Sequence, residues 1–338
     1  MNDLFTIKTL DFEEFEVCHQ ALSPLKVPLE QTPLWGDFDD SIANRSFLGS
    51  FRYDDAEGKM VAIASATLYQ QKGRDWIWIK HGPLFASVPN TEVIQKMCST
   101  LRSQFKEVAG TKPLFIRLSM PQKVHPLLLP FEHTMYDETV VLDLSQTEDE
   151  ILAGMSQSGR QGYRRALKAG VEIREITENT TQVFSSECYP ILAETGKRGG
   201  FGIHPESLYT AMLEKLKDKV RLYCAYFDET IVAWAITTEY DGSALYYYGG
   251  SNDTARDTSA PYLLHVEIIK AMQARGNATY DFMGIAGKNY PSLANVTQFK
   301  LKFSKNIEKV PQAYDLPLQN IKYHAISLAI KTKRKIKL

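Results

Sequence analysis

Cysteine is scarce in this sequence, and its four cysteines stand far apart, at Cys18, Cys98, Cys188 and Cys224. They form no CxxC pair, and no histidine stands near them at a spacing typical of zinc ligands. These absences exclude a zinc finger and a dense disulfide framework. We therefore expect reduced thiols and no metal site.

Long apolar runs and a surplus of charge of either sign are also missing. No window approaches the roughly twenty apolar residues that a membrane-spanning helix needs. The acidic N-terminal stretch MNDLFTIKTLDFEEF lacks the apolar core of a signal peptide. The net charge of -1 does not predict nucleic-acid binding by the protein as a whole, so any basic site has to be local. We expect a cytoplasmic protein.

The order of predicted elements occurs twice along the 338 residues, in pattern more than in identity. Aromatic and β-branched runs predict three strands in each half, at 46–53, 60–69 and 75–80, and at 220–227, 231–240 and 245–249. A helix and one more strand follow, the strands at 113–118 and 280–285. Helix-rich stretches at about 11–22 and 148–215 precede the two units. The pattern predicts two α/β domains of the same plan.

Two segments are locally basic. Ser145 to Glu148 reads as a capping box that starts a helix, and this helix carries Arg160, Arg164 and Lys168 on one face. That face is either solvated or a surface for phosphates. The second segment, 321–338, combines an apolar helical face with a basic end. It suits RNA, an anionic membrane surface or a merely solubilising tail.

The duplicated unit resembles the acetyltransferase (GNAT) fold, with mixed twisted sheets flanked by helices. Acyl-CoA users of that fold place a glycine-rich loop before the central helix, where backbone N–H groups meet the pyrophosphate. The equivalent loops here, 85–89 and 252–257, contain no glycine. Coenzyme A is therefore disfavoured.

Seven short motifs, spread over nearly the whole chain, point to a more specific resemblance. They are Gln31–Gly36, Lys80–Pro83, Leu142–Leu144, Tyr248–Ser251, Ala260–Tyr262, Tyr280–Ile285 and Phe299–Lys300. In this order they resemble the Fem (FemABX) family of peptidoglycan bridge-forming, tRNA-dependent aminoacyltransferases. Because 206–219 leaves room for only one short helix, the chain resembles the compact members without a coiled-coil arm.

The resemblance implies tandem GNAT-like domains, the first at 1–143 with 313–338 packing back on it and the second at 144–312. It implies transfer of an amino acid from aminoacyl-tRNA to the stem-peptide amine of a peptidoglycan precursor, either lipid II or UDP-MurNAc-pentapeptide. We expect a monomer without a cofactor, in the cytoplasm or in peripheral contact with the inner face of the membrane. The alternatives are an acyl-CoA-dependent N-acyltransferase of the same fold and a non-catalytic tRNA-binding relative.

The resemblance also assigns the catalytic residues. Lys300 is placed near the acyl ester, where it stabilises the oxyanion, and Phe299 packs against the terminal adenine of the tRNA. An aminoacyl ester is already activated, and no Ser-His-Asp or Cys-His motif is evident, so direct transfer to the amine is expected. The plainer alternative is that Phe299 and Phe303 lie in the core and that Lys300 and Lys302 extend into solvent.

Further positions are predicted to bind substrate or tRNA. Tyr246 and Tyr248 are predicted on one strand face, and the resemblance places Tyr248 and Tyr262 near the groove. Arg117 ends a strand, where it suits a phosphate, a carboxylate or a surface ion pair.

Two positions depart from the family pattern. Ser119 replaces an acidic residue, and His204 stands where users of soluble precursors carry a cation. Both are retained as substrate contacts, and the second departure favours either a lipid-linked acceptor or phosphate contacts at other positions. Arg160, Arg164, Lys168 and Lys302 are the expected tRNA contacts.

Overall fold

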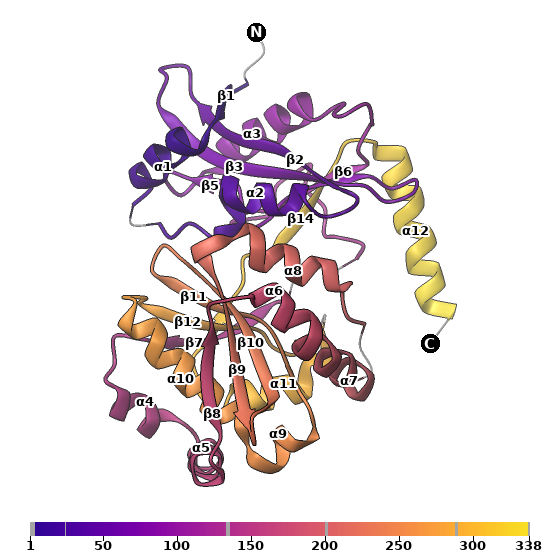
Figure 1. Ribbon diagram of the computed structural model, residues 1–338. Helices are drawn as coiled ribbons and strands as arrows, with labels where there is room; N and C mark the ends of the chain where they lie inside the picture. Colours follow the sequence, from indigo (N-terminus) through magenta and orange to yellow (C-terminus); the bar gives the residue numbers. More distant parts are fainter. Residues whose placement is uncertain (1–3, 24, 133–135, 200–201, 288–289, 337–338) are drawn as a thin grey trace. The chain divides into compact units, whose positions relative to one another are not determined.

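The structure is a computed structural model that describes residues 4–23, 25–132, 136–199, 202–287 and 290–336. The chain forms two compact units, Met1–Met135 with Pro311–Leu338 and Tyr136–Val310. Each unit contains a seven-stranded mixed sheet with helices packed on it (Figure 1).

The sheet of the first unit has the strand order β1-β2-β3-β4-β6-β14, with β5 paired to β3. Its strands are β1 (Thr6–Leu10), β2 (Arg45–Asp54), β3 (Met60–Tyr69), β4 (Trp76–Ile79), β5 (Leu84–Phe85), β6 (Phe115–Ser119) and β14 (Ala313–Pro317). Its helices are α1 (Phe12–Ala21), α2 (Pro33–Asp40), α3 (Thr91–Gln104) and α12 (Asn320–Ile336). The helix α3 crosses between the parallel strands β4 and β6, with Ile94, Met97 and Leu101 buried along one face.

The sheet of the second unit has the order β13-β7-β12-β11-β10-β9-β8. Its strands are β7 (Glu138–Asp143), β8 (Glu172–Ile176), β9 (Val220–Phe227), β10 (Thr230–Tyr240), β11 (Ser243–Ser251), β12 (Thr279–Gly284) and β13 (Ile307–Lys309). Its helices are α4 (Glu148–Gly154), α5 (Gln157–Ala169), α6 (Thr180–Val183), α7 (Tyr189–Gly199), α8 (Glu206–Lys215), α9 (Asp253–Thr258), α10 (Ala260–Ala274) and α11 (Ala294–Lys300).

The two units repeat one plan, as the sequence pattern predicted. In each, an antiparallel meander leads into a long helix that crosses to a parallel strand: β4, α3 and β6 in the first unit, β11, α10 and β12 in the second. A parallel pair needs such a crossover because the chain has to return to the same end of the sheet. The expected tandem α/β fold with mixed sheets is confirmed.

The boundary between the units differs from the expected one at residues 143 and 144. The strand β7 pairs antiparallel with β12, where Tyr280 lies opposite Leu142, and it also pairs with β13. It is therefore built into the second sheet, and the second unit begins at Tyr136. The sequence shows a strand here but not which sheet it joins.

The predicted basic helix consists of two helices, and its expected start is two residues too early. The capping box is formed by Thr147 and Glu150, because the Thr147 side chain accepts from the Glu150 N–H and Glu150 reaches back to the Thr147 N–H. Ser145 lies in a turn, where its N–H donates to the Asp143 carboxylate at 2.8 Å. The chain is extended at Met155, and α5 then starts with a new cap.

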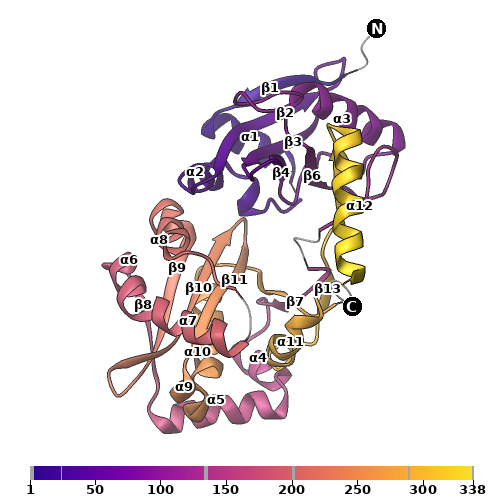
Figure 2. The same cartoon turned by 90° about the vertical axis from the view of Figure 1, so that its right-hand side faces the viewer.

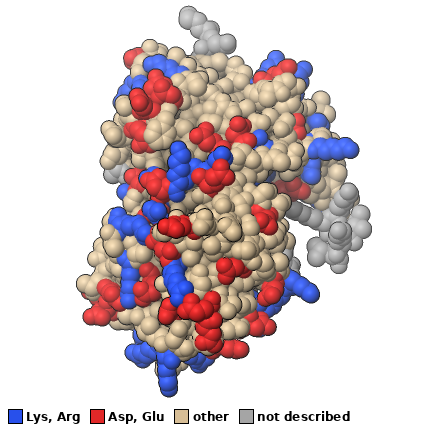
Figure 3. Space-filling model, in the orientation of Figure 1, with Lys and Arg blue, Asp and Glu red and all other residues tan. Residues whose placement is uncertain are grey.

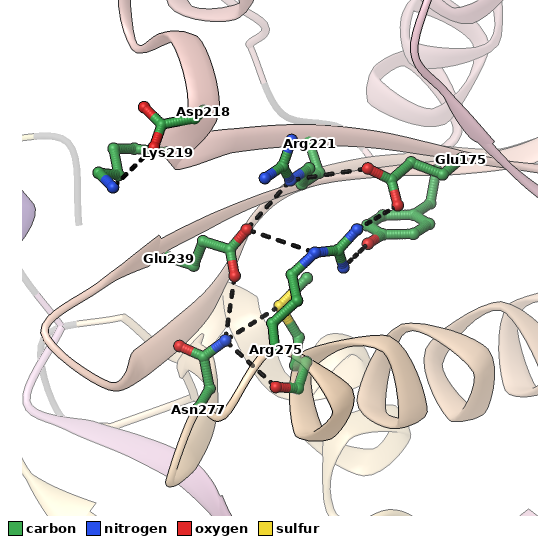
Figure 4. Close-up of polar contacts among 9 residues, drawn as sticks. Glu175, Asp218, Lys219, Arg221, Glu239, Arg275 and Asn277 are labelled. Carbon is green, nitrogen blue, oxygen red and sulfur yellow. Dashed lines mark hydrogen bonds and ion pairs between the residues drawn. The ribbon is translucent and has the colours of Figure 1, made fainter.

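An ionic network fixes the C-terminal end of α10 to the sheet (Figure 4). Arg275 lies between Glu175, at 2.5 Å, and the hydroxyl of Tyr223, at 2.7 Å. Glu239 accepts from Arg221 at 3.0 Å and from Asn277 at 3.0 Å. Charge-assisted hydrogen bonds of this kind hold the helix in one register on strands β8 to β10. The other end of α10 carries the residues of the candidate site.

Candidate active site

The parallel strands β11 and β12 separate partway along their length. Their pairing runs from Ser243 opposite Thr279 to Leu245 opposite Asp281, although β11 continues to Ser251 and β12 to Gly284. A bulge in the pairing of β10 with β11 and a left-handed conformation at Met283 accompany the separation. The last carbonyl groups of β12 are thus available to a donor other than β11.

Lys300 is that donor. It is the last residue of α11, its side chain is only 6% exposed, and its Nζ atom donates to the carbonyl oxygens of Met283 at 3.1 Å and Gly284 at 2.6 Å. Burial lowers the pKa of the Lys300 ammonium to about 8, although the carboxylate of Asp281 acts in the opposite direction. The alternative, in which Lys300 extends into solvent, is wrong. The side chain is a positioned cation that can release a proton close to neutral pH.

An aromatic cluster lies beside the segment that carries Lys300. Phe299 is half-buried and lies 5.4 Å from the ring of Tyr262 and 5.2 Å from that of Phe303. Lys302 donates to the Tyr262 hydroxyl at 2.8 Å. The structure therefore brings together four of the predicted residues: Phe299, Lys300, Tyr262 and Lys302.

His265 belongs to the same cluster, and sequence reasoning missed it. Its ring lies 5.5 Å from Phe299 and 4.5 Å from Tyr246, and its Nδ1 atom shares a 3.0 Å hydrogen bond with the Tyr280 hydroxyl. Burial and the charge of Lys300 lower the pKa of this imidazole to about 3, so it is neutral. The sequence signal that could have identified His265 is a titratable residue at a position that the apolar periodicity of the helix predicts to be buried.

The basic helix α5 packs directly against the segment that carries Lys300. An added Cβ at Gly162 would lie 2.5 Å from the Tyr262 ring, and one at Gly159 would lie 2.8 Å from the carbonyl oxygen of Lys302. The Ser156 N–H also donates to that oxygen at 2.9 Å. Two glycines thus allow the backbone of α5 to approach the site closely.

The cations of α5 have different roles from one another. The Arg160 guanidinium donates to the carbonyl oxygens of Ala153 and Met155 at the end of α4, so it holds the two helices together, and its contact with phosphate stays a prediction. Arg164 and Lys168 are exposed, and no ion pair joins them to a carboxylate within the described residues. Figure 3 shows lysines and arginines gathered at the end of this unit that α5 forms. Their binding to tRNA remains a prediction.

Tyr246 and Tyr248 lie on opposite faces of the sheet, contrary to the expectation of a shared face. Tyr248 stands opposite Ile236 and Tyr246 opposite Thr237, so the intervening Tyr247 has no partner of its own on β10. This extra residue reverses the alternation of side chains. Tyr246 packs on His265, whereas Tyr248 packs on other aromatic residues.

The partners of Tyr248 are Tyr209, at 4.9 Å between ring centroids, and His204, at 6.2 Å. His204 is exposed, and its backbone N–H donates to the Tyr209 hydroxyl at 3.2 Å. The structure therefore brings together a second pair of predicted substrate residues, on the face of the sheet away from His265.

Arg117 and Ser119 lie in the first unit, and both side chains are buried. Its side chain is 2% exposed and forms a two-point ion pair with Asp315, at 2.7 and 3.0 Å. It also faces the ring of Trp76 at 5.1 Å. The predicted surface ion pair at Arg117 is wrong, because β14 brings Asp315 beside it in the core, and binding of substrate by Arg117 stays a prediction. The Ser119 hydroxyl is buried and has no hydrogen-bond partner within the described residues.

Comparisons with known proteins indicate the class of protein to which the second unit is similar. Residues 156–292 match the family model of the acetyltransferase (GNAT) domain. This match covers the centre of the second unit, including α5, the strands β8 to β12 and α10. Fold and domain together indicate an acyltransferase. No curated protein matches the chain in sequence.

Among solved structures, the chain is similar to FemX, with a TM-score of 0.77 and 14% identity over 95% of this chain and 100% of that chain. It is also similar to a tandem GNAT protein from the clavulanic acid biosynthesis pathway, with a TM-score of 0.54 and 11% identity over 93% and 98%. A third structure is the C-terminal domain of an Agrobacterium fabrum protein described as a lysylphosphatidylglycerol synthetase, with a TM-score of 0.50 and 12% identity over 95% and 96%. The expected tandem GNAT architecture and the likeness to the Fem fold are confirmed.

Proposed function

We propose that this protein is an aminoacyltransferase that moves an amino acid from aminoacyl-tRNA to the stem-peptide amine of a peptidoglycan precursor and so builds the interpeptide bridge. The observation that carries the proposal is the buried ammonium of Lys300 on the end of β12, beside the half-buried ring of Phe299. The identity of the substrates in this proposal rests on the resemblance of the Phe299–Lys300 motif to the Fem family.

The enzyme has to supply a cation rather than a nucleophile, because the acceptor amine is itself the nucleophile. The acceptor amine attacks the ester carbonyl carbon and an oxyanion forms. The bond to the ribose oxygen then breaks, and that oxygen takes the proton released by the amine and leaves as a hydroxyl. A donor that is already positioned for the oxyanion stabilises this transition state by about 3 to 4 kcal/mol. Lys300 fits that role, because two carbonyl groups fix its ammonium and leave it a third N–H.

The neighbouring residues suit the end of a tRNA. The partly exposed ring of Phe299 offers a stacking surface for the terminal adenine, an interaction worth about 1 to 3 kcal/mol. The exposed cations Arg164 and Lys168 lie on a helix whose other face touches Tyr262 and Lys302. Their charges attract the phosphate backbone without sequence preference.

The segment before α10 favours this proposal over an acyl-CoA-dependent reaction. The short helix α9 fills the place where acyl-CoA users carry a glycine-rich loop, and its cap residue Asn252 accepts from the Ala255 N–H at 3.0 Å, which occupies one of its first-turn donors. In its first turn, Asp253 pairs with Arg256 at 2.7 Å and with Arg198 at 3.3 Å, so both guanidinium groups are already engaged by a carboxylate. The same helix ends in Ser259, directly before α10.

The test offers the protein competing donors and acceptors. Labelled aminoacyl-tRNA pools or acetyl-CoA are incubated with lipid II and with UDP-MurNAc-pentapeptide, and the mass added to each acceptor is read. We expect the mass of one amino acid on at least one precursor and no acetylation. Acetylation of an amine acceptor without aminoacyl transfer would overturn the proposal in favour of the acyl-CoA alternative.

A further inference from the structure

The last helix, α12, is apolar on two opposite sides, and the core of the first unit explains only one of them. On the inner side, Tyr323, Ile326 and Ile330 pack with Trp76 and Phe115. On the outer side, Ile321 is 89% exposed and Leu328 is 68% exposed. At 100° per residue, the exposed Ala325 lies between these two, so the outer side chains form a continuous stripe.

The charge along this helix has one sign. From Asn320 to the end, the sequence holds six lysines and arginines and no aspartate or glutamate, in a protein whose net charge is -1. Lys322 and Lys331 are exposed, and they flank the stripe on its two sides. In Figure 2, α12 begins beside β6, and its C-terminal part extends beyond the sheet of the first unit.

We propose that the outer face of α12 binds the surface of an anionic lipid bilayer. Ile321 and Leu328 would enter the headgroup region, while the flanking lysines would meet anionic headgroups. No helix in the described part of the chain is long and apolar enough to cross a membrane. In this proposal α12 lies along the bilayer surface. The inference goes beyond the proposed reaction and does not depend on it.

The exposed apolar stripe of α12, together with its positive charge, favours a lipid surface over two other partners. An RNA would use the cations, but it would gain nothing from the exposed isoleucine and leucine. A protein groove would bury the apolar side chains, but it would not require cations alone along both flanks of the stripe. A bilayer with anionic lipids uses both features at once.

The first experiment measures co-sedimentation of the full chain with vesicles of phosphatidylglycerol and phosphatidylcholine, and with phosphatidylcholine alone. We expect binding to the anionic vesicles only, weakened by salt. The double variant Ile321→Ser with Leu328→Ser should bind at least about tenfold more weakly. The control Val88→Ser removes an apolar side chain that is 93% exposed elsewhere in the same unit, and it should bind like the parent protein.

A second experiment reports the depth of α12 directly. All four native cysteines are buried, so an environment-sensitive dye can be attached to Leu328→Cys, with Val88→Cys as its control. We expect a blue shift on anionic vesicles for the dye at position 328 alone. Three results would overturn the proposal: equal binding by the double serine variant, equal binding to phosphatidylcholine, or a loss of tRNA affinity in that variant without any vesicle binding by the parent.

Discussion

The Nζ atom of Lys300 lies 2.6 Å from the carbonyl oxygen of Gly284, the last residue of β12. The contact joins the end of α11 to the strand end at which β11 has already separated. It places a cation where the backbone provides two acceptors and no carboxylate. A charge held in this way is weakly neutralised, because the nearby Asp281 carboxylate already accepts from Thr139 and from the Met283 N–H.

The first prediction concerns the pH dependence of transfer. Burial lowers the pKa of Lys300 to about 8, so its ammonium loses its proton as the pH rises through that value. If the charged form stabilises the oxyanion, kcat/KM should fall on the alkaline side with a midpoint near pH 8. The measurement is the pH profile of aminoacyl transfer in the parent protein and in Lys300→Met.

The variant should lack this alkaline limb, whatever its residual rate. An identical limb in both proteins would assign the titration to another group, such as the substrate amine.

The same group makes a prediction about stability. Between about pH 8 and the ordinary pKa of a lysine, near 10.4, the unfolded chain holds a proton on Lys300 that the folded protein has released. The free energy of unfolding should therefore rise with pH in this window, by at most about 3 kcal/mol relative to Lys300→Met. Denaturant titrations of both proteins at several pH values measure the difference. A parallel pH dependence in the two proteins would show that the lysine titrates normally.

The close approach of α5 to Tyr262 is the subject of the third prediction. In Gly162→Ala the new Cβ would lie 2.5 Å from the Tyr262 ring, so the helix or the ring has to move. We expect a loss of about 1 to 3 kcal/mol in stability and a fall in transfer of about tenfold or more. Gly154→Ala is the matched control, because a Cβ there meets nothing within 4 Å. Equal behaviour of the two variants would remove α5 from the site.

The fourth prediction separates the two kinds of cation on α5. Replacing both Arg164 and Lys168 by Gln should reduce the slope of log Kd for tRNA against log salt by roughly 1 to 2, because phosphate contacts are lost. Arg160→Gln should leave the slope unchanged and lower stability, since Arg160 donates to the end of α4. Filter binding over a series of salt concentrations provides the slopes.

The control for this prediction is the double variant Lys59→Gln with Lys72→Gln, which removes two exposed charges from the first unit. If it changes the slope as much as the α5 variant does, the binding of tRNA is not localised on α5.

The buried pair of Arg117 and Asp315 gives the last prediction. Arg117→Met removes the guanidinium that pairs with the buried Asp315 carboxylate, which also accepts from the Tyr323 hydroxyl at 2.8 Å, and should cost about 3 to 5 kcal/mol. The double variant Arg117→Met with Asp315→Leu should recover most of that loss, because it removes the uncompensated charge. Thermal and denaturant unfolding measure both. A mild effect of the single variant on stability, with a large one on acceptor KM, would restore Arg117 as a substrate contact.

Local pattern was enough to predict the repeated plan of the fold. The alternation of β10 and β11, the helix from Ser259 and the strand to Ile285 are each encoded in a short stretch, so they could be derived from residue spacing. The close grouping of Phe299, Lys300 and Tyr262 followed from the family resemblance.

The features of the fold and the site that the sequence could not predict depend on residues that are far apart in the chain. Asp315, the partner of Arg117, is 198 residues away and reaches it through an added strand. The bulge that turns Tyr246 and Tyr248 to opposite faces is a property of the register between two strands, not of either strand alone. Arg160 donates to the end of α4 because the chain is extended at Met155, between α4 and α5. The sequence pattern predicts one continuous basic helix across this break.

The most direct test of the account is the rate of single-turnover transfer from labelled aminoacyl-tRNA to its precursor by Lys300→Met, with Lys305→Met as the control at an exposed lysine on the same segment. The account predicts a fall of at least about a hundredfold for Lys300→Met, with folding intact, and a normal rate for the control. A Lys300→Met rate close to that of the parent protein would contradict it.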